Sequence, residues 1–200
     1  MRNPIRLKNL KLRFALLYLL GTLALFLHRP HPLTLAPGVG LVVLGIALRG
    51  WGAGHLVKNE RLTISGPYAH LRHPLYAGTL LVGVGFGLIA GGPFSLLLLA
   101  LLLPWFFLMY FPRKERVESA RLEHRYGNGY TNYRDGVPAL IPSLRAWRPA
   151  PESKPESDHH QNEQENTWSR ERYIENNELG SLIALLVGLL IFGLRAQLGS

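Results

Sequence analysis

Ionisable and aromatic side chains gathered around two prolines are the part of this sequence best suited to chemistry. In the segment GPYAHLRHPLYAG, residues 66–78, Arg72 and His73 directly precede Pro74, and a tyrosine stands on either side. Pro74 biases His73 away from helical dihedral angles and favours the first helical position, so we expect His73 at a helix N-cap. The first N–H groups of a helix lack partners and attract anions. The segment therefore predicts a site for a carboxylate or phosphate group, and anchoring to lipid headgroups is the competing interpretation.

A second polar segment, residues 113–135, follows an apolar block and has helical character. Tyr126, Tyr130 and Tyr133 are spaced to share one helical face. Tyrosines surrounded by arginines are also typical of an aromatic belt at the lipid headgroups. The pattern leaves both a binding site and a belt open.

Together, the two segments resemble the isoprenylcysteine carboxyl methyltransferase-like family of membrane methyltransferases and the related phospholipid N-methyltransferases. That family's pattern runs roughly G-P-Y-x-x-x-R-H-P-x-Y-x-G, then a helix hairpin, then E-E-x-x-L-x-x-x-F-G-x-x-Y-x-x-Y-x-x-x-V-P-x-x-x-P. The first part is matched by Gly66, Pro67, Tyr68, Arg72, His73, Pro74, Tyr76 and Gly78. The second part is matched by Glu118, Leu122, Tyr126 (for Phe), Gly127, Tyr130, Tyr133, Val137, Pro138 and Pro142. The resemblance covers about residues 40–142, and two separated blocks make it specific.

The resemblance implies S-adenosylmethionine bound at the cytoplasmic face and a lipophilic methyl acceptor that arrives from within the membrane. The implied catalytic residues are His73 and Arg72. The implied cofactor-binding residues are Tyr68, His73, Tyr76, Gly78, Glu118 and Tyr126. The implied partners are a lipid or lipophilic small molecule and the membrane lipids.

The chemistry of methyl transfer agrees with these residue types. An in-line displacement from a sulfonium needs alignment and a dry pocket more than a special nucleophile. Arg72, His73 and the helix terminus suit the cofactor's carboxylate, Glu118 suits its ammonium group, and Tyr76 and Tyr126 suit the slot for adenine. A carboxylate acceptor needs no base, whereas for an amine acceptor His73 is the nearest candidate.

One position departs from the family pattern, because Ser119 stands where a second Glu is usual. Glu115 and Glu123 are the candidates to replace it, and on an ideal helix Glu115 lies one turn from Glu118. Two other hypotheses stay open. Basic clusters beside the predicted spans would suit the phosphates of NADPH in a membrane reductase, and the loss of the second Glu would suit a non-catalytic membrane module.

Apolar blocks must hold these segments at a membrane. The chain has 200 residues, of which 48% are hydrophobic. A bilayer core needs about 17–25 apolar residues per helix. The five blocks near this length are Phe14–Leu27, Leu33–Leu48, Leu75–Ala90, Phe94–Phe111 and Leu179–Leu194. We therefore predict an all-α, multi-pass transmembrane helical bundle with four core helices and a C-terminal fifth.

Within this bundle, prolines and glycines predict where helices begin and approach one another. The third and fourth spans are expected to begin at Pro74 and Pro93, and residues 49–73 are expected to form a polar loop. Gly83 and Gly87 form a small-xxx-small pair in the third span. Such a pair indicates either a groove for a cofactor or close helix packing.

Charge predicts the orientation of the chain. Residues 1–150 carry 18 Lys and Arg against 5 Asp and Glu, whereas residues 151–200 carry 4 against 8. The positive-inside rule then predicts a cytoplasmic N-terminus and explains the net charge of +9 without nucleic acid. The chain has no cysteine, which excludes thiolate catalysis and thiol-bound metal. No metal site is predicted, and His159–His160 is interpreted as incidental.

The composition divides the chain into three parts. Residues 1–148 form the predicted methyltransferase-like membrane core, residues 149–166 a flexible acidic linker, and residues 167–200 an amphipathic segment with a last transmembrane helix. The last part resembles a terminal extension of some bacterial members. Its residues 176–178, Asn-Asn-Glu, are either polar flanking residues or a cap that reaches back to the pocket.

Overall fold

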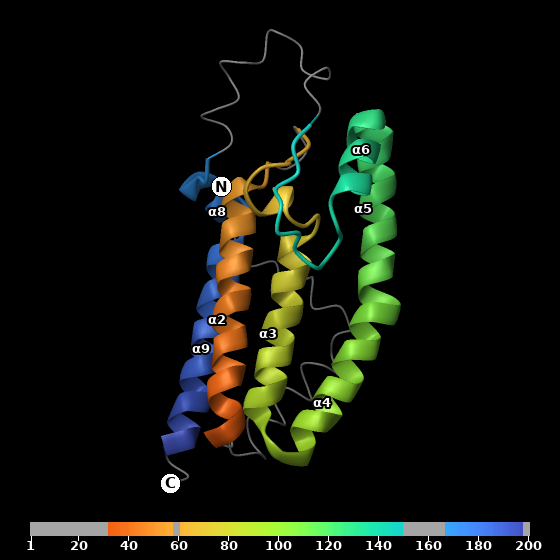
Figure 1. Cartoon of the computed structure of the whole chain (residues 1–200). Coiled ribbons are helices and arrows are strands. Elements are labelled where there is room, and N and C mark those ends of the chain that lie inside the picture. The colour runs from red at the N-terminus through yellow and green to blue at the C-terminus, as the bar shows by residue number, and fades with distance from the viewer. Residues whose placement is uncertain (1–31, 58–60, 150–166, 198–200) are drawn as a thin grey trace, which may run out of the picture.

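The computed structural model describes residues 32–57, 61–149 and 167–197, and these residues form helices and loops without a strand. Four long rods stand side by side in Figure 1. They are α2 (Pro32–His55), α3 (Pro74–Ala90), the continuous α4 (Gly92–Pro104), η4 (Trp105–Tyr110) and α5 (Phe111–Tyr126), and α9 (Glu178–Gln197). The short elements gather at the upper end (Figure 1). The predicted all-α bundle is confirmed, and the first predicted span, Phe14–Leu27, lies outside the described residues.

Three of these rods are long and apolar enough to cross a membrane: Leu33–His55, Gly92–Tyr126 and Glu178–Arg195, while α3 is a shorter apolar helix. The 35 residues of Gly92–Tyr126 extend about 50 Å at 1.5 Å per residue, well beyond a hydrocarbon core of about 30 Å. The polar part of this rod, α5, must therefore project from the bilayer. The protein is an integral membrane protein, as predicted.

Glycines let the backbones of α2 and α3 touch. A Cβ atom on Gly45 would lie 2.7 Å from the carbonyl oxygen of Gly78, and one on Gly38 would lie 2.8 Å from the carbonyl oxygen of Gly85. No side chain larger than hydrogen fits at such distances. The glycines of α2 thus admit a neighbouring helix, which is one of the uses that small residues have in membrane helices.

The small residues of α3 that face the next helix also serve packing. A Cβ atom on Gly83 would lie 2.9 Å from Leu102 Cδ2 of α4, and one on Gly87 would lie 2.8 Å from Leu99 Cδ2. Leucine side chains of α4 therefore cover both glycines. Close helix packing, and not a groove for a cofactor, explains this pair.

The C-terminal helix α9 is part of the bundle. Phe192 is buried with Val42 of α2 and Ile89 of α3 in one apolar cluster. The ring of Phe192 lies 5.9 Å from that of Phe86, centroid to centroid. α9 therefore packs against both α2 and α3 along the membrane-facing length of the protein.

Two helix boundaries differ from the prediction. α3 begins at Pro74 as expected, but α4 begins at Gly92, one residue before Pro93. The larger difference is in α2, which continues to His55 instead of giving way to a loop at residue 49. Its last residues alternate glycine with larger side chains. The C-terminal segment of the chain donates hydrogen bonds to the carbonyl groups of these residues.

The predicted tyrosine face is interrupted by a helix break. Gly127 has φ 50°, a left-handed value that favours glycine, and it separates α5 from α6 (Asn128–Gly136). Tyr126 therefore ends one helix, while Tyr130 and Tyr133 belong to the next. Only 1% of Tyr130 and 3% of Tyr133 is exposed. This burial rules out an aromatic belt at the headgroups for these two residues.

The predicted linker, residues 149–166, lies outside the described residues except for Pro149. The chain resumes with α8 (Arg170–Glu175), which is followed directly by α9. Asn177 connects the two helices with φ 61°, a conformation that asparagine tolerates better than most residues.

Candidate active site

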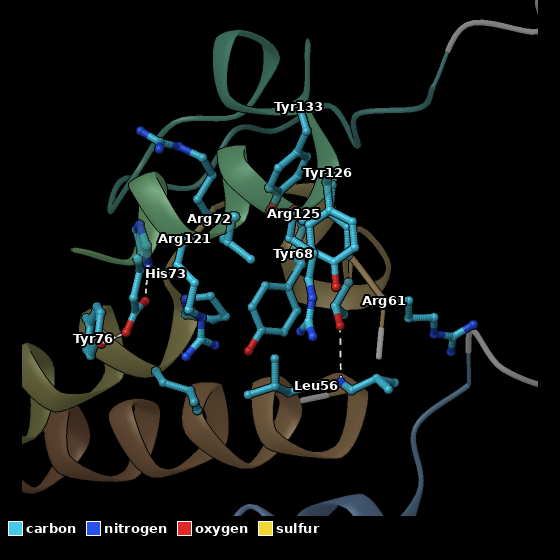
Figure 2. Close-up of a pocket in the computed structure, with 17 residues that line it drawn as sticks. Leu56, Arg61, Tyr68, Arg72, His73, Tyr76, Arg121, Arg125, Tyr126 and Tyr133 are labelled. Atoms are coloured by element: carbon cyan, nitrogen blue, oxygen red, sulfur yellow. Dashed lines mark hydrogen bonds and ion pairs between the residues drawn. The ribbon is translucent and has the colours of Figure 1, made fainter. Parts of the chain in front are cut away.

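A cavity of about 410 Å³ lies at the polar end of the bundle, between α5 and the segment that joins α2 to α3. Ligand pockets in proteins span about 300–1,000 Å³, so a small molecule fits here. Figure 2 shows Tyr68, Arg121 and Arg125 near the middle of the cavity, while the side-chain ends of Arg61 and Arg72 point outward. Its lining combines apolar residues with Arg61, Arg72, His73, Glu118, Arg121 and Arg125.

The segment that follows α6 holds the backbone of Arg72 and His73 in place. The N–H of Arg72 donates to the carbonyl oxygen of Pro138 at 2.9 Å, and that of His73 donates to Ala139 at 3.1 Å. The Nε of Arg72 also donates to the carbonyl oxygen of Val137 at 3.0 Å. The two motifs that stand far apart in the sequence thus form one structure, in which the second positions the first.

His73 is the N-cap of α3, as predicted, with φ −126° and ψ 62° and with Pro74 directly after it. Its side chain makes no capping hydrogen bond to the helix. The imidazole turns toward α5 instead. Pro74 begins α3, so His73 lies just outside the helix and its ring can face the glutamates of α5.

Two glutamates of α5 contact the histidine. Glu115 pairs with Arg72, whose Nη1 lies 2.6 Å from Oε1, and its other oxygen contacts Nε2 of His73. Glu118 lies on the opposite side of the ring, with Oε2 3.7 Å from Nδ1 of His73. The Tyr76 hydroxyl donates a hydrogen bond to Oε1 of Glu118 (Figure 2). These contacts form one continuous polar chain, Arg72–Glu115–His73–Glu118–Tyr76.

Glu115 takes the space next to Ser119, where the family pattern has its second Glu. The Ser119 hydroxyl lies 3.4 Å from Oε1 of Glu115 and 2.7 Å from the Tyr130 hydroxyl oxygen. Glu123 instead pairs with Arg134 at 3.2 Å, with half of its side chain exposed. Of the two replacements expected from the sequence, Glu115 is the one that reaches Arg72 and His73.

Tyrosines form the opposite side of the cavity. Tyr68 lies in the short helix η3 (Gly66–Ala69) and is buried. Its carbonyl oxygen accepts a hydrogen bond of 2.8 Å from the Tyr133 hydroxyl. Burial raises the pKa of both tyrosines above the ordinary value, so both hydroxyls stay protonated and Tyr133 remains a donor. The half-buried ring of Tyr126 completes this side.

Aromatic rings pack against the histidine of the polar chain. The ring of His73 stacks on that of Tyr76 with centroids 5.4 Å apart, and Phe111 meets His73 edge-on at 5.6 Å. Phe111 directly follows the π-helical turn η4, which is a common position for functional residues. The charged groups therefore lie at the point where the apolar rod becomes polar.

Six of the seven predicted site residues surround the cavity, and Gly78 is the exception. Gly78 is not among the lining residues. A Cβ atom there would lie 2.5 Å from Arg49 Cγ and 2.8 Å from the carbonyl oxygen of Gly45. The structure thus places Gly78 at the α2–α3 contact and not against a ligand.

Sequence reasoning missed the wall that α2 contributes. Leu56 and Val57 line the cavity directly after the end of α2. They are apolar residues in what the sequence indicated to be a polar loop, and this contrast was the available signal. Among the described residues, no group of three or more His, Asp or Glu side chains is arranged to hold a metal ion.

Asn176 and Glu178 also differ from both of their predicted roles. Neither lines the cavity. Glu178 pairs with Arg49 of α2, and Asn176 donates hydrogen bonds to the end of the same helix. They contact α2 behind the cavity wall and do not reach the surface that lines the cavity.

Comparison with known proteins extends this description. Residues 33–129 match the family model described as phospholipid methyltransferase. The protein-S-isoprenylcysteine O-methyltransferase of Schizosaccharomyces pombe is 34% identical over 118 residues, which cover 53% of this chain and 48% of that protein. The cobalt-zinc-cadmium resistance protein CzcN of Cupriavidus metallidurans is 36% identical over 119 residues, covering 58% and 53%. The Homo sapiens protein-S-isoprenylcysteine O-methyltransferase is 31% identical over 120 residues, covering 54% and 41%.

The chain spans about half the length of the curated relatives it matches. No solved structure matches it. Fold and site together define a helical integral membrane protein with a charged, aromatic cavity at one end. Its similarity to the phospholipid methyltransferase model and to the isoprenylcysteine methyltransferases confirms the resemblance of its two motifs to this family of membrane methyltransferases.

Proposed function

We propose that this protein transfers a methyl group from S-adenosylmethionine to a lipophilic acceptor at the cytoplasmic face of the membrane. The observation that carries the proposal is the polar chain Arg72–Glu115–His73–Glu118–Tyr76 at the edge of a cavity beside membrane-embedded helices. The resemblance to this family supports a methyltransferase, since several relatives bear the name of one.

The donor set of the cavity fits the chemical groups of S-adenosylmethionine. Glu118 offers a carboxylate to an ammonium group, and the Arg72 guanidinium offers positive charge to a carboxylate, with His73 beside it. Tyr68 and Tyr126 offer aromatic faces for adenine. When bound, this cofactor supplies a methyl group on a sulfonium, which is reactive enough that the protein needs to align it and exclude water.

Within this proposal the protein's own residues have separate tasks. His73 and Arg72 contact the ligands, so they keep the catalytic role that the resemblance implied. Glu115 is a positioning residue, because it fixes the Arg72 guanidinium and one ring nitrogen of His73 from the side away from the cavity. Tyr76 holds the Glu118 carboxylate toward the same ring.

The charge of the cavity favours an anionic acceptor. Arg61, Arg72, Arg121 and Arg125 line it, and Glu118 is the one carboxylate among the described lining residues, while Glu115 pairs with Arg72 from outside the lining. A protonated amine would be repelled by this excess of positive charge, whereas a carboxylate would be attracted. A carboxylate acceptor also needs no base, so His73 would act by binding and orientation.

The arrangement of helices supports the proposed orientation and division of the chain. The segment that joins α2 to α3 and the arginine-rich α5 lie at the same end of the bundle, and the turn at Gly91 lies at the other (Figure 1). The positive-inside rule then puts the cavity and the N-terminus in the cytoplasm. We retain a core of residues 1–148 and a C-terminal part of residues 167–200, with five spans in all.

Thermal unfolding of the detergent-purified protein tests the cofactor. At about 100 times its Kd, a ligand stabilises the folded state by about 2.7 kcal/mol. We expect S-adenosylmethionine and S-adenosylhomocysteine to raise the unfolding temperature and NADPH to leave it unchanged. Stabilisation by NADPH alone would point to a reductase, and no stabilisation by any of the three would point to a non-catalytic module.

Radiolabelled cofactor tests the acceptor. Membranes that contain the protein are incubated with S-adenosylmethionine labelled on its methyl group, and lipids are extracted. We expect label in the lipid fraction that mild alkali converts to volatile methanol, because methyl esters hydrolyse to methanol and N-methyl groups do not. Alkali-resistant label would overturn the anionic acceptor, and unlabelled lipid would overturn methyl transfer to a lipophilic compound.

A further inference from the structure

The last turn of α2 receives hydrogen bonds from the C-terminal part of the chain. Asn176 Nδ2 donates to the carbonyl oxygens of Ala53 at 2.8 Å and Leu56 at 3.0 Å. The backbone N–H of Ser169 donates to the carbonyl oxygen of Gly54 at 2.9 Å. The last four carbonyl groups of a helix have no partner within it. Residues more than a hundred positions away therefore cap α2.

The fit of this cap to α2 is close. Trp168 Nε1 donates to the carbonyl oxygen of Gly50 at 3.0 Å. A Cβ atom on Gly54 would lie 1.9 Å from the same Nε1 atom, so only glycine permits this position of the indole. The small residues at the end of α2, which lie in the segment expected to form a polar loop, form the surface on which the cap lies.

A buried ion pair joins the same two parts of the chain. Glu178 accepts from Nη2 of Arg49 at 2.6 Å and from Nε at 3.0 Å. The third guanidinium nitrogen donates to the Thr79 hydroxyl at 2.5 Å and to the carbonyl oxygen of Leu75 at 3.4 Å. Only 8% of the Glu178 side chain is exposed. Arg49 thus links the start of α9 to the first turns of α3.

Both attachment points border the cavity. The carbonyl group that Asn176 binds belongs to Leu56, which lines the cavity together with Val57. The carbonyl group that Arg49 binds belongs to Leu75, which lines the cavity next to Tyr76. The matched family model ends at residue 129, so this support comes from outside the region shared with the family.

We propose that Asn176 and Glu178 are positioning residues for the cavity: through Leu56 and Arg49 they hold its α2 wall and the first turn of α3 at the distance that ligand binding requires. The proposal rests on the proposed function only for the identity of the ligand. The C-terminal extension is then a working part of the site and not only a further membrane anchor.

The absence of cysteine from the chain allows a reporter that needs no ligand. Val57→Cys would place the only thiol in the cavity wall, and its rate of reaction with a maleimide measures how well that wall is held. We expect Asn176→Ala and Glu178→Ala to speed labelling about five- to tenfold, the range expected from losing one or two net hydrogen bonds. Leu190→Ala, on the exposed side of α9, is the matched control and should leave the rate unchanged.

Affinity for S-adenosylhomocysteine, measured by isothermal titration, is the second readout. We expect the Kd to rise about tenfold in Asn176→Ala and Glu178→Ala and to stay unchanged in Leu190→Ala. Asn176→Asp and Glu178→Gln preserve size and provide folded variants should the alanine variants fail to fold. Asn176→Asp should behave like the alanine change, because it removes the donor, whereas Glu178→Gln should show about a threefold effect.

The outcomes separate this proposal from the proposed function. Unchanged labelling and unchanged affinity in folded Asn176→Asp would overturn the positioning role, and so would equal effects in Leu190→Ala. Faster labelling in the variants would support the positioning role even if the native protein bound no adenosyl compound. That absence of binding would overturn only the methyltransferase proposal.

Discussion

The two walls of the cavity are built by different physical means. The α5 wall is held by charge, since Glu115 and Glu118 contact Arg72, His73 and Tyr76 through side chains. The α2 wall is apolar at the cavity and is held from behind, through backbone carbonyl groups that a distant segment satisfies. A charged wall can recognise and orient a charged ligand, whereas a capped helix end only fixes the position of the wall that it supports. Variants on the two sides should therefore fail in different ways.

The largest effect is expected for the α5 wall. Glu118→Ala removes the carboxylate that faces both His73 and Tyr76, and we expect affinity for S-adenosylmethionine to fall about a hundredfold, because charged hydrogen bonds are the strong ones. In His73→Ala the affinity for S-adenosylmethionine should fall by a similar factor. Isothermal titration measures both.

Glu123→Ala is the matched control for these variants. Glu123 lies on the same helix and pairs with Arg134 at an exposed site, so the change should alter affinity by less than about twofold. A comparable loss in Glu123→Ala would mean that α5 acts only through its overall charge.

Glu115 should give the next largest effect. Glu115→Ala leaves Arg72 and His73 without their shared carboxylate, and we expect a loss of affinity of about twentyfold. Ser119→Glu in the same chain restores a carboxylate one turn further along α5. That double variant should recover most of the affinity, whereas no recovery would refute the view that Glu115 replaces the usual second Glu.

Gly78→Ala tests whether Gly78 serves the α2–α3 contact instead of a ligand. The new Cβ atom would meet the carbonyl oxygen of Gly45 at 2.8 Å, and overpacking of this kind costs about 1–3 kcal/mol. The unfolding temperature should fall, and because the new methyl group also meets Arg49, the folded variant should lose no more cofactor affinity than the loss of about tenfold expected for Glu178→Ala.

Gly193→Ala serves as the control for Gly78→Ala, because within the described part of the chain nothing beyond its own helix backbone and chain neighbours lies within 4 Å of its added Cβ atom. It should leave the unfolding temperature unchanged or slightly higher, since alanine favours the helix. A large loss of affinity without loss of stability in Gly78→Ala would return Gly78 to the ligand site.

The smallest effect is expected where a single neutral hydrogen bond holds the loop. Tyr133→Phe removes the bond to the carbonyl oxygen of Tyr68 and should cost about 1 kcal/mol. Burial raises the pKa of Tyr133, so the unfolded chain ionises first as the pH rises. Stability should therefore be unaffected below about pH 10 and should fall above it.

The comparison of unfolding temperatures between pH 8 and pH 11 measures this dependence. Tyr133→Phe should decline less steeply than the native sequence above pH 10, because it has one fewer buried phenol to ionise. Identical slopes would show that the Tyr133 hydroxyl is not held in a buried environment.

The residues that line the cavity were largely predictable, because their types and spacing form a specific pattern in the sequence. Arg72 and His73 before Pro74 indicated a helix N-cap beside a basic residue, and the structure has His73 at the N-cap of α3. The tyrosines were harder, because a 3.6-residue period assumes an unbroken helix, and Gly127 breaks it. Gly78 was assigned by its place in a motif, although its lack of a side chain serves the neighbouring helix.

The amino-acid sequence by itself determined that this chain forms apolar helices, that a charged and aromatic segment begins one of them, and which family its motifs resemble. These properties depend on residue type and on near neighbours, which a sequence displays directly. Only the tertiary structure decided that Glu115 faces His73, that α2 extends to His55 and that the C-terminal segment caps it. Those outcomes depend on which distant groups satisfy a carbonyl or a charge removed from water, and that becomes known only when the chain is folded.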